Sequence, residues 1–222
     1  MHKNLIKKVA IFASLALVFI VSFLLIPKTR YNITKEEATL RSVDGLVYNY
    51  EVKDTYLKRP ITTIGVKAFK DSLTLKTVRL GQNIEYIERL AFAGCKNLYE
   101  FEFNQNIKGI DNNMFKDCIS LEKVSFGADS ELRMIGGSMF FNCKNLSNIE
   151  IPEKVTHIYT YAFFGCVSLT EITIPESVIH IYNDVFFGCD NLKKIIINGE
   201  PVLDDDWLNG TPADIVVEYN IK

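Results

Sequence analysis

Five cysteines with nearly regular spacing are the residues of this sequence best suited to chemistry. Cys95, Cys118, Cys143, Cys166 and Cys189 each follow a phenylalanine by three positions. Cysteine thiolates bind zinc and act as nucleophiles, and thiols form disulfides. No C-x-x-C or H-x-x-x-H spacing accompanies these cysteines, and no basic residue recurs beside all five of them. We therefore expect a buried column of thiols, with disulfides between neighbouring cysteines as the alternative.

The two histidines outside the N-terminal segment, His157 and His180, lie 23 residues apart. A metal ion would need further ligands at the same spacing, and the equivalent positions hold Thr63, Tyr86, Gly109 and Met134. Residues 204–206 are three aspartates without the alternating spacing of a calcium loop, and we interpret them as a helix start before Trp207. We therefore expect no catalytic residues, no metal site and no cofactor, and we do not predict an enzyme.

A third group of candidate residues is aromatic. Phe141, Phe164 and Phe187 are spaced 23 residues apart. Two histidines and three tyrosines lie near them in the sequence: His157, Tyr159, Tyr161, His180 and Tyr182. Aromatic residues are enriched at binding hot spots, so these eight side chains are the candidate partner-binding surface. The alternative is that the rings only pack against one another between adjacent repeats.

These candidates belong to an internal repeat. A phenylalanine recurs at spacings of 23, 23, 25, 23 and 23 residues: Phe69, Phe92, Phe115, Phe140, Phe163 and Phe186. An isoleucine stands five residues before each of these phenylalanines, and a leucine stands six residues after it. The two extra residues between the third and fourth copies fall within 127–132, where we expect a loop bulge that leaves the apolar columns intact. Such a period predicts stacked coils, because one short coil cannot bury its own apolar face.

Each copy also contains local structure signals. Alternating stretches such as 170–174 predict a short parallel strand with one buried face. The segment 162–166, with Gly165 at its bend, predicts a short helical turn. The outer face of the predicted strands is a second candidate binding surface, polar and mixed in sign: Glu100, Glu102, Lys123, Ser125, Asn148, Glu150, Glu171, Thr173, Lys194 and Ile196.

The repeat resembles the BspA-like leucine-rich repeat, whose unit reads roughly L-x-x-I-x-I-P-x-x-V-x-x-I-x-x-x-A-F-x-G-C. Residues 169–189 carry the resemblance through Leu169, Ile172, Ile174, Pro175, Val178, Ile181, Phe186, Gly188 and Cys189. Met114 and Val185 replace the alanine, and Ser72 replaces the first cysteine. The resemblance implies an α/β leucine-rich-repeat solenoid of six repeats over residues 61–197, with parallel strands and short helical turns. It also implies a surface-exposed binding or adhesion protein.

The segments on either side of the repeats are expected to cap the solenoid. In the N-terminal cap, residues 31–60, the pair Asp44-Gly45 predicts a hairpin between 38–43 and 46–52. A hairpin there would cover the open edge of the first coil. In the C-terminal cap, residues 198–222, we expect a polar turn over 201–210 and a last strand over 215–219.

Residues 1–30 have the layout of an export signal. Lys3, Lys7 and Lys8 precede the apolar run 9–26, which is long enough to cross a bilayer as a helix. The only small-x-small pattern, from Ala13 to Ala16, lies too early in the run for cleavage after it. The segment is therefore either an uncleaved signal anchor, forming an N-terminal membrane helix, or a cleaved signal peptide. The basic start favours a cytoplasmic N-terminus and an extracellular remainder.

Charge excludes one class of partner. The net charge is −2, and residues 1–30 hold +5, so the remaining 192 residues sum to −7. An acidic domain without a basic cluster does not favour nucleic acid. We therefore predict a binding module at the cell membrane, or secreted if the segment is cleaved, with a protein or glycan partner outside the cell. The alternative is a structural spacer or a subunit of a surface assembly.

Overall fold

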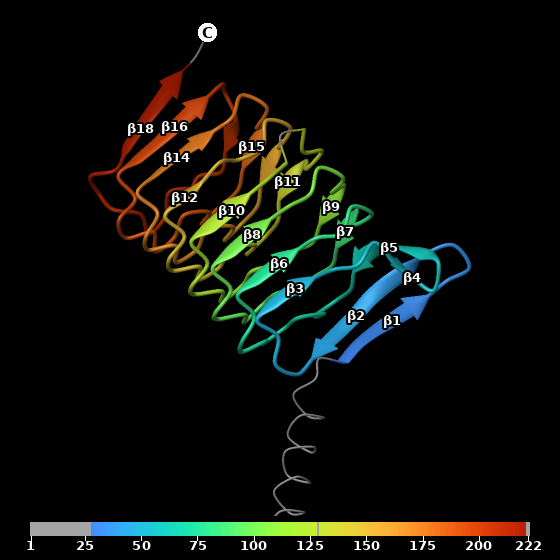
Figure 1. Ribbon diagram of the computed structural model, residues 1–222. Coiled ribbons are helices and arrows are strands. Elements are labelled where there is room, and N and C mark those ends of the chain that lie inside the picture. The colour runs from blue at the N-terminus through green and yellow to red at the C-terminus, as the bar shows by residue number, and fades with distance from the viewer. Residues whose placement is uncertain (1–27, 128, 221–222) are drawn as a thin grey trace, which may run out of the picture.

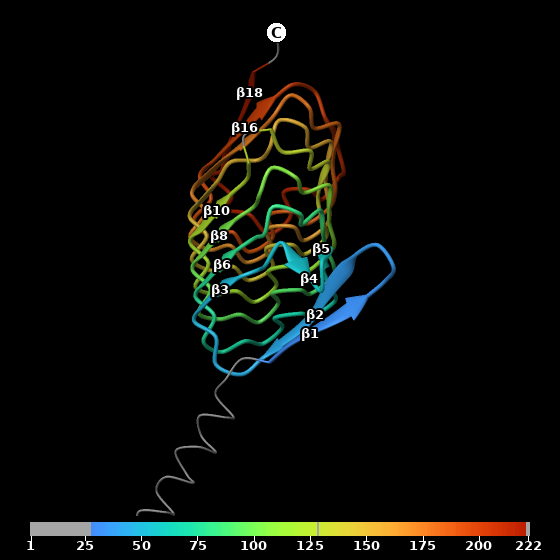
Figure 2. The same cartoon turned by 45° about the vertical axis from the view of Figure 1, so that its right-hand side comes forward.

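The computed structural model describes residues 28–127 and 129–220 of the chain. Within this part the chain winds into about eight coils that stack into a rod (Figure 1). Each coil places one strand in a front row and one in a rear row, and the coils enclose a flattened interior (Figure 2). The predicted signal anchor or signal peptide falls on the apolar run 9–26, outside the described residues. The described part includes no helical segment with the length and hydropathy of a membrane span.

Parallel pairing between neighbouring coils builds both rows, with one interruption among the described residues of each: between β12 and β14 in the front row and between β9 and β11 in the rear row. The front row contains β3 (Asn49–Glu51), β6 (Thr77–Arg79), β8 (Glu100–Glu102), β10 (Lys123–Ser125), β12 (Asn148–Ile149), β14 (Glu171–Ile174), β16 (Lys194–Asn198) and β18 (Val216–Asn220). The rear row contains β2 (Ala38–Asp44), β5 (Arg59–Ile64), β7 (Tyr86–Ile87), β9 (Gly109–Ile110), β11 (Met134–Ile135), β13 (His157–Ile158), β15 (His180–Ile181) and β17 (Val202–Leu203). Two further strands, β1 (Lys28–Ile33) and β4 (Thr55–Tyr56), pair antiparallel with β2 and β5.

The repeat positions align across neighbouring coils, which confirms the expected parallel solenoid. Ile158 pairs with Ile135 on one side and with Ile181 on the other, and all three side chains are fully buried. The polar residues that alternate with the apolar ones in the front strands face outward. Period-two alternation therefore sets the register, because a shift by one residue would place every apolar side chain on the solvent side.

Replacing Ile158 by alanine should lower the free energy of unfolding by roughly 2–5 kcal/mol, because the side chain is fully buried and the neighbouring coils cannot close the cavity. Urea unfolding followed by circular dichroism measures this cost. Thr173 is exposed on β14, so Thr173→Ala serves as the control and should change stability by about 0.5 kcal/mol or less. Equal costs for the two variants would show that the assigned register is wrong.

The predicted helical turns are wrong: the described residues contain tight turns and no helix. Around Phe163, the amides of Ala162, Phe164 and Cys166 donate to carbonyls three residues earlier. The intervening amides, of Phe163 and Gly165, donate instead to the next coil. In a helix every amide donates to a carbonyl four residues earlier in the same segment, whereas here every second amide donates to a carbonyl of the next coil. The turns therefore contribute hydrogen bonds between coils as well as within them.

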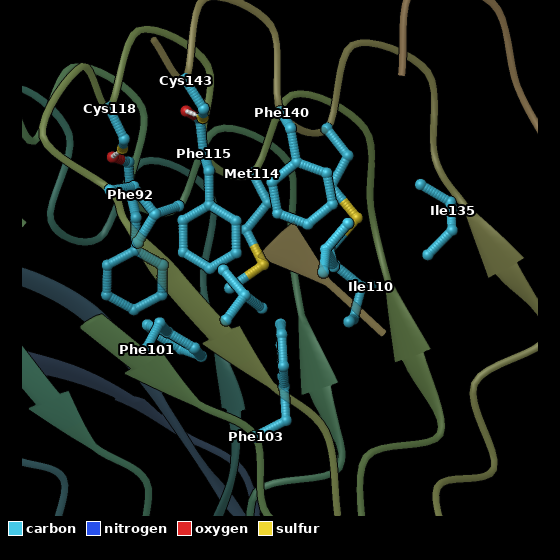
Figure 3. Close-up of a cluster of buried hydrophobic side chains, with 14 of the residues drawn as sticks. Phe92, Phe101, Phe103, Ile110, Met114, Phe115, Cys118, Ile135, Phe140 and Cys143 are labelled. Carbon is cyan, nitrogen blue, oxygen red and sulfur yellow. Dashed lines mark hydrogen bonds between the residues drawn. The ribbon is translucent and has the colours of Figure 1, made fainter. Parts of the chain in front are cut away.

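The repeat phenylalanines form one ring stack through the core, and Figure 3 shows Phe92, Phe115 and Phe140 of this stack. Centroids of successive rings from Phe69 to Phe186 lie 4.8, 6.0, 5.6, 5.4 and 5.6 Å apart. Tyr50 meets Phe69 edge-on at 5.1 Å, and Trp207 meets Phe186 edge-on at 6.4 Å. Aromatic side chains from the flanking segments thus close both ends of the stack.

The expected hairpin at Asp44-Gly45 is also wrong. The hairpin of this region joins β1 to β2 instead, through a turn in which Thr34 Oγ1 accepts the amide of Glu37 at 3.0 Å. At Asp44-Gly45 the chain turns a corner from β2 in the rear row towards β3 in the front row. Leu40 pairs with Ile64, so β2 is drawn into the coil stack. A local turn signal cannot distinguish such a corner from a hairpin.

The two extra residues before the fourth coil interrupt the rear row. Strand β9 pairs with β7, and β11 pairs with β13, but within the described residues β9 and β11 do not pair. The turn side remains continuous, since the amide of Phe115 donates to the carbonyl of Met139 at 2.9 Å. The apolar columns thus continue as expected, while the backbone ladder of the rear row is broken at this point.

Candidate functional site

Phe141, Phe164 and Phe187, which we call the phenylalanine edge, form a second ring stack outside the core. Their centroids are 4.4 and 5.1 Å apart, with interplanar angles of 2° and 4°. The tight turn positions each ring one residue after a core phenylalanine, on the opposite side of the backbone. Phe187 is 36% exposed, and the other two rings are half-buried.

Both ends of the phenylalanine edge are covered by groups that the sequence analysis did not single out as partners. The ammonium group of Lys116 lies 4.6 Å from the Phe141 centroid, a cation–π distance. At the other end Gly210 lies against Phe187, so that a Cβ at Gly210 would fall 2.5 Å from Phe187 Cδ2. Ring faces are therefore occupied by neighbours, and the edge offers ring rims to a partner. The contact of Lys116 with Phe141 could have been predicted from the repeat spacing, because the two residues occupy the same position in successive repeats.

Tyr161 joins the phenylalanine edge through an edge-on contact with Phe164 at 5.7 Å. Its backbone is left-handed, with φ of 61°. A left-handed residue stands two positions before every repeat phenylalanine, at Lys67, Leu90, Asn113, Ser138, Tyr161 and Asp184. A bulky residue rarely adopts this conformation. The turn geometry imposes it at this position, and the tyrosine side chain is 39% exposed as a result.

His157, Tyr159, His180 and Tyr182 form a separate cluster, the histidine–tyrosine ladder, at the rear row. The rings of Tyr159 and Tyr182 stack at 4.7 Å, and His180 stacks on Tyr182 at 4.2 Å. Partial burial, the neighbouring Tyr159 and a hydrogen bond with that tyrosine raise the pKa of Tyr182. Strands β13 and β15 place the histidines side by side, as expected from their 23-residue spacing.

Asp204 completes the ladder. Its Oδ1 lies 2.7 Å from His180 Nε2, and the amide of Asp204 donates to the carbonyl of Ile181. The predicted helix start at 204–206 is wrong, because these residues continue the coil geometry after β17 and lead into a turn. The aspartate occupies the place in the last coil that Tyr182 occupies in the previous one. No group of three or more metal-ligating side chains occurs in the described part of the chain.

The cysteines form the predicted buried column. All five are fully buried free thiols, and each Sγ lies 3.1–3.2 Å from the carbonyl oxygen of a phenylalanine in the preceding coil. Burial raises the pKa of Cys95 and Cys189 to about 12 and raises the pKa of the three inner thiols well above its usual value. A neutral, enclosed thiol is a poor nucleophile and a poor metal ligand. The column therefore packs the core.

The outer face of the front row pairs its charges between coils. Lys123 lies 3.3 Å from Glu100, and Lys194 lies 2.9 Å from Glu218. Hydrogen bonding with Glu218 raises the pKa of Lys194. Exposed pairs of this kind contribute little to stability. On this face the two lysine–glutamate pairs therefore join neighbouring coils.

A rod of coils with parallel strand rows, buried isoleucine and leucine columns and tight connecting turns defines a leucine-rich-repeat solenoid. The chain belongs to the BspA-type leucine-rich-repeat family, whose model matches residues 45–166 and 125–203 with 6 copies of the repeat. The family thus agrees with the resemblance seen in the sequence.

Solved structures of bacterial leucine-rich-repeat proteins share the fold. A leucine-rich-repeat protein of T. pallidum is 25% identical, with a TM-score of 0.71 over 75% of this chain and 78% of that one. A leucine-rich-repeat protein of Bacteroides ovatus is 24% identical, with a TM-score of 0.72 over 88% of this chain and 60% of that one. A third, from Eubacterium ventriosum, is 18% identical, with a TM-score of 0.69 over 84% of this chain and 50% of that one. The search of curated proteins found no match.

Proposed function

We propose that this protein is a binding module at the outer surface of the cell, rather than an enzyme, and that it recognises a protein partner through the phenylalanine edge. Tyr161 and the histidine–tyrosine ladder extend the contact surface. Membership of the BspA-type leucine-rich-repeat family and the predicted export signal support the location. The aromatic composition of the surface supports a protein partner, because aromatic side chains dominate interface hot spots.

One observation carries this proposal: the turns of the earlier coils do not need an aromatic residue at this position. Lys70, Ala93 and Lys116 occupy it in the first three repeats. Their turns have the same pair of left-handed residues around the core phenylalanine and the same amides donated to the next coil. The backbone therefore forms without the extra ring. The three consecutive phenylalanines are confined to one end of the rod, where they create an apolar strip.

Replacing Phe141, Phe164 and Phe187 together by serine should abolish partner binding while the solenoid stays folded. The full-length chain, purified in a mild detergent, is tested by surface plasmon resonance against extracellular-matrix proteins and whole-cell surface extracts. We expect saturable binding that weakens about a hundredfold or more in the triple variant, since each lost hot-spot ring costs about 2 kcal/mol. Circular dichroism and thermal unfolding check the fold.

The matched control is Lys70→Ser, which changes the equivalent turn position in a coil without the phenylalanine edge. It should bind as the unaltered protein does. A triple variant that unfolds would show that the rings serve packing. A folded triple variant with undiminished binding would move the interface elsewhere on the rod. The absence of binding to every target would favour the role of spacer or assembly subunit.

A further inference from the structure

A groove of about 530 Å³ lies on the rear row, at the break between β9 and β11, away from the phenylalanine edge. Gly109 forms part of its lining, in register with Tyr86 of the preceding coil. In the following coil Met134 stands at the other side of the break. The missing side chain at Gly109 and the broken ladder together leave this hollow on an otherwise continuous row.

The groove contains one solvent-exposed aromatic side chain, Tyr86. Tyr86 is 46% exposed and makes no ring contact within the described residues. A Cβ at Gly109 would come within 3.2 Å of Tyr86 Cδ1, so the ring lies against Gly109 and a side chain at this position would crowd it. Met134, 42% exposed, adds an apolar wall on the far side. A flat, partly apolar ligand of about one ring in width fits this arrangement.

Several hydrogen-bond acceptors of the groove are unused within the described residues. The carbonyls of Glu85 and Ile87 accept amides from the next coil, whereas among the described residues those of Lys108 and Ile110 do not. The carboxylate of Asp111 also has no hydrogen bond or ion pair within the described part of the chain. A ligand with hydroxyl donors can pair with these acceptors.

The cations near the groove are already paired. Lys108 lies 2.9 Å from Glu85, which raises the pKa of the lysine, and Arg133 lies 3.3 Å from Glu131. Glu88, which also lines the groove, accepts the amide of Val66 at 2.8 Å. The lining itself holds two acids, Glu88 and Asp111, and two cations, and each of these cations is paired with an acid outside the lining, so an acidic ligand is disfavoured.

We propose that this groove binds a neutral sugar ring of an oligosaccharide. One C–H face of the sugar stacks on the Tyr86 ring, as apolar surfaces do on aromatic faces. Its hydroxyl groups donate to the carboxylates of Asp111 and Glu88 and to the backbone carbonyls of Lys108 and Ile110. The site lies outside the phenylalanine edge, and so it can exist whether or not that edge binds a protein.

The methyl group of Met134 provides the test, because Met114 and Met139 are fully buried and supply internal references. The full-length chain is labelled with ¹³C-methyl methionine and titrated with cellotetraose, maltotetraose and N-acetylchitotetraose. We expect a saturable shift of the Met134 signal with at least one of them. Tyr86→Ala and Gly109→Val should each weaken binding by about tenfold or more, while Tyr86→Phe should retain it.

Four results would overturn the proposal. These are the absence of a shift with every neutral oligosaccharide, an undiminished affinity in Tyr86→Ala, a shift with a hyaluronan tetrasaccharide alone, and a shift with tetralysine alone. Tyr86 is exposed, so its removal should leave the fold intact even if Gly109→Val disturbs the row. A triple variant of the phenylalanine edge should keep the Met134 shift, which separates failure of this site from failure of the protein-binding surface.

Discussion

Replacing Phe163 by alanine should lower the free energy of unfolding by about 3–5 kcal/mol. The ring is fully buried between Phe140 and Phe186, at centroid distances of 5.4 and 5.6 Å. Its loss opens a cavity between coils and removes two ring contacts at once. In a solenoid, stability depends on the interfaces between neighbouring repeats, so a defect in an inner coil weakens two of them. Urea unfolding followed by circular dichroism gives the free energy.

The adjacent residue supplies the control. Phe164 also stacks on two rings, at 4.4 and 5.1 Å, but it is half-buried on the outside of the turn. Phe164→Ala should therefore cost about 1–2 kcal/mol, mainly through the lost ring contacts. If the two variants cost the same, the phenylalanine edge is as important for packing as the core stack, and its role as a binding surface loses its support.

The repeating part of the fold could be predicted because each side chain of the core recurs. Six copies place Ile158 and Phe163 in columns whose spacing fixes strand register, burial and the stacking of coils. The same spacing correctly predicted the thiol column and the neighbouring positions of His157 and His180. A signal that recurs in every coil identifies a position even where one copy is ambiguous.

The unpredicted features depend on single copies or on contacts between coils. Leu40 and Leu203 occupy the isoleucine column in the first and last coils, but the sequence around them departs from the repeat. The contact of Asp204 with His180 joins residues 24 apart, one coil to the next. A helix was expected in the turns because local composition cannot show that alternate amides bond to the next coil. Likewise, the two inserted residues within 127–132 predicted a loop bulge, but they did not predict the break in the rear row or the groove at Gly109.

The second large effect should be a loss of stability at alkaline pH, driven by the cysteine column. Burial raises the pKa of each thiol in the folded protein, to about 12 for Cys95 and Cys189. In the unfolded chain a thiol has a pKa of about 8.5. The neutral thiol is therefore the form that the fold stabilises. This stabilisation is complete below the unfolded pKa and is lost as the pH rises towards the folded pKa, because the unfolded state releases the proton first.

The size of the effect follows from the number of thiols. Each buried thiol should reduce the free energy of unfolding by about 1.4 kcal/mol per pH unit above about pH 9. All five are fully buried and none is in a disulfide. Together they give a slope of about 7 kcal/mol per pH unit, comparable with the whole stability of a domain. We therefore expect cooperative unfolding between about pH 9 and pH 11, measured by circular dichroism.

Cys166→Ala isolates one thiol. Its Sγ lies 3.2 Å from the carbonyl oxygen of Phe140, so the variant should be less stable at neutral pH. Between about pH 9 and pH 11, however, its stability should fall less steeply, by about 1.4 kcal/mol per pH unit. Val185→Ala truncates another fully buried side chain that cannot ionise, and its slope should match that of the unaltered protein. Parallel slopes for Cys166→Ala and the unaltered protein would mean that this thiol does not titrate on unfolding, as in a disulfide, and the column would then be an oxidised one.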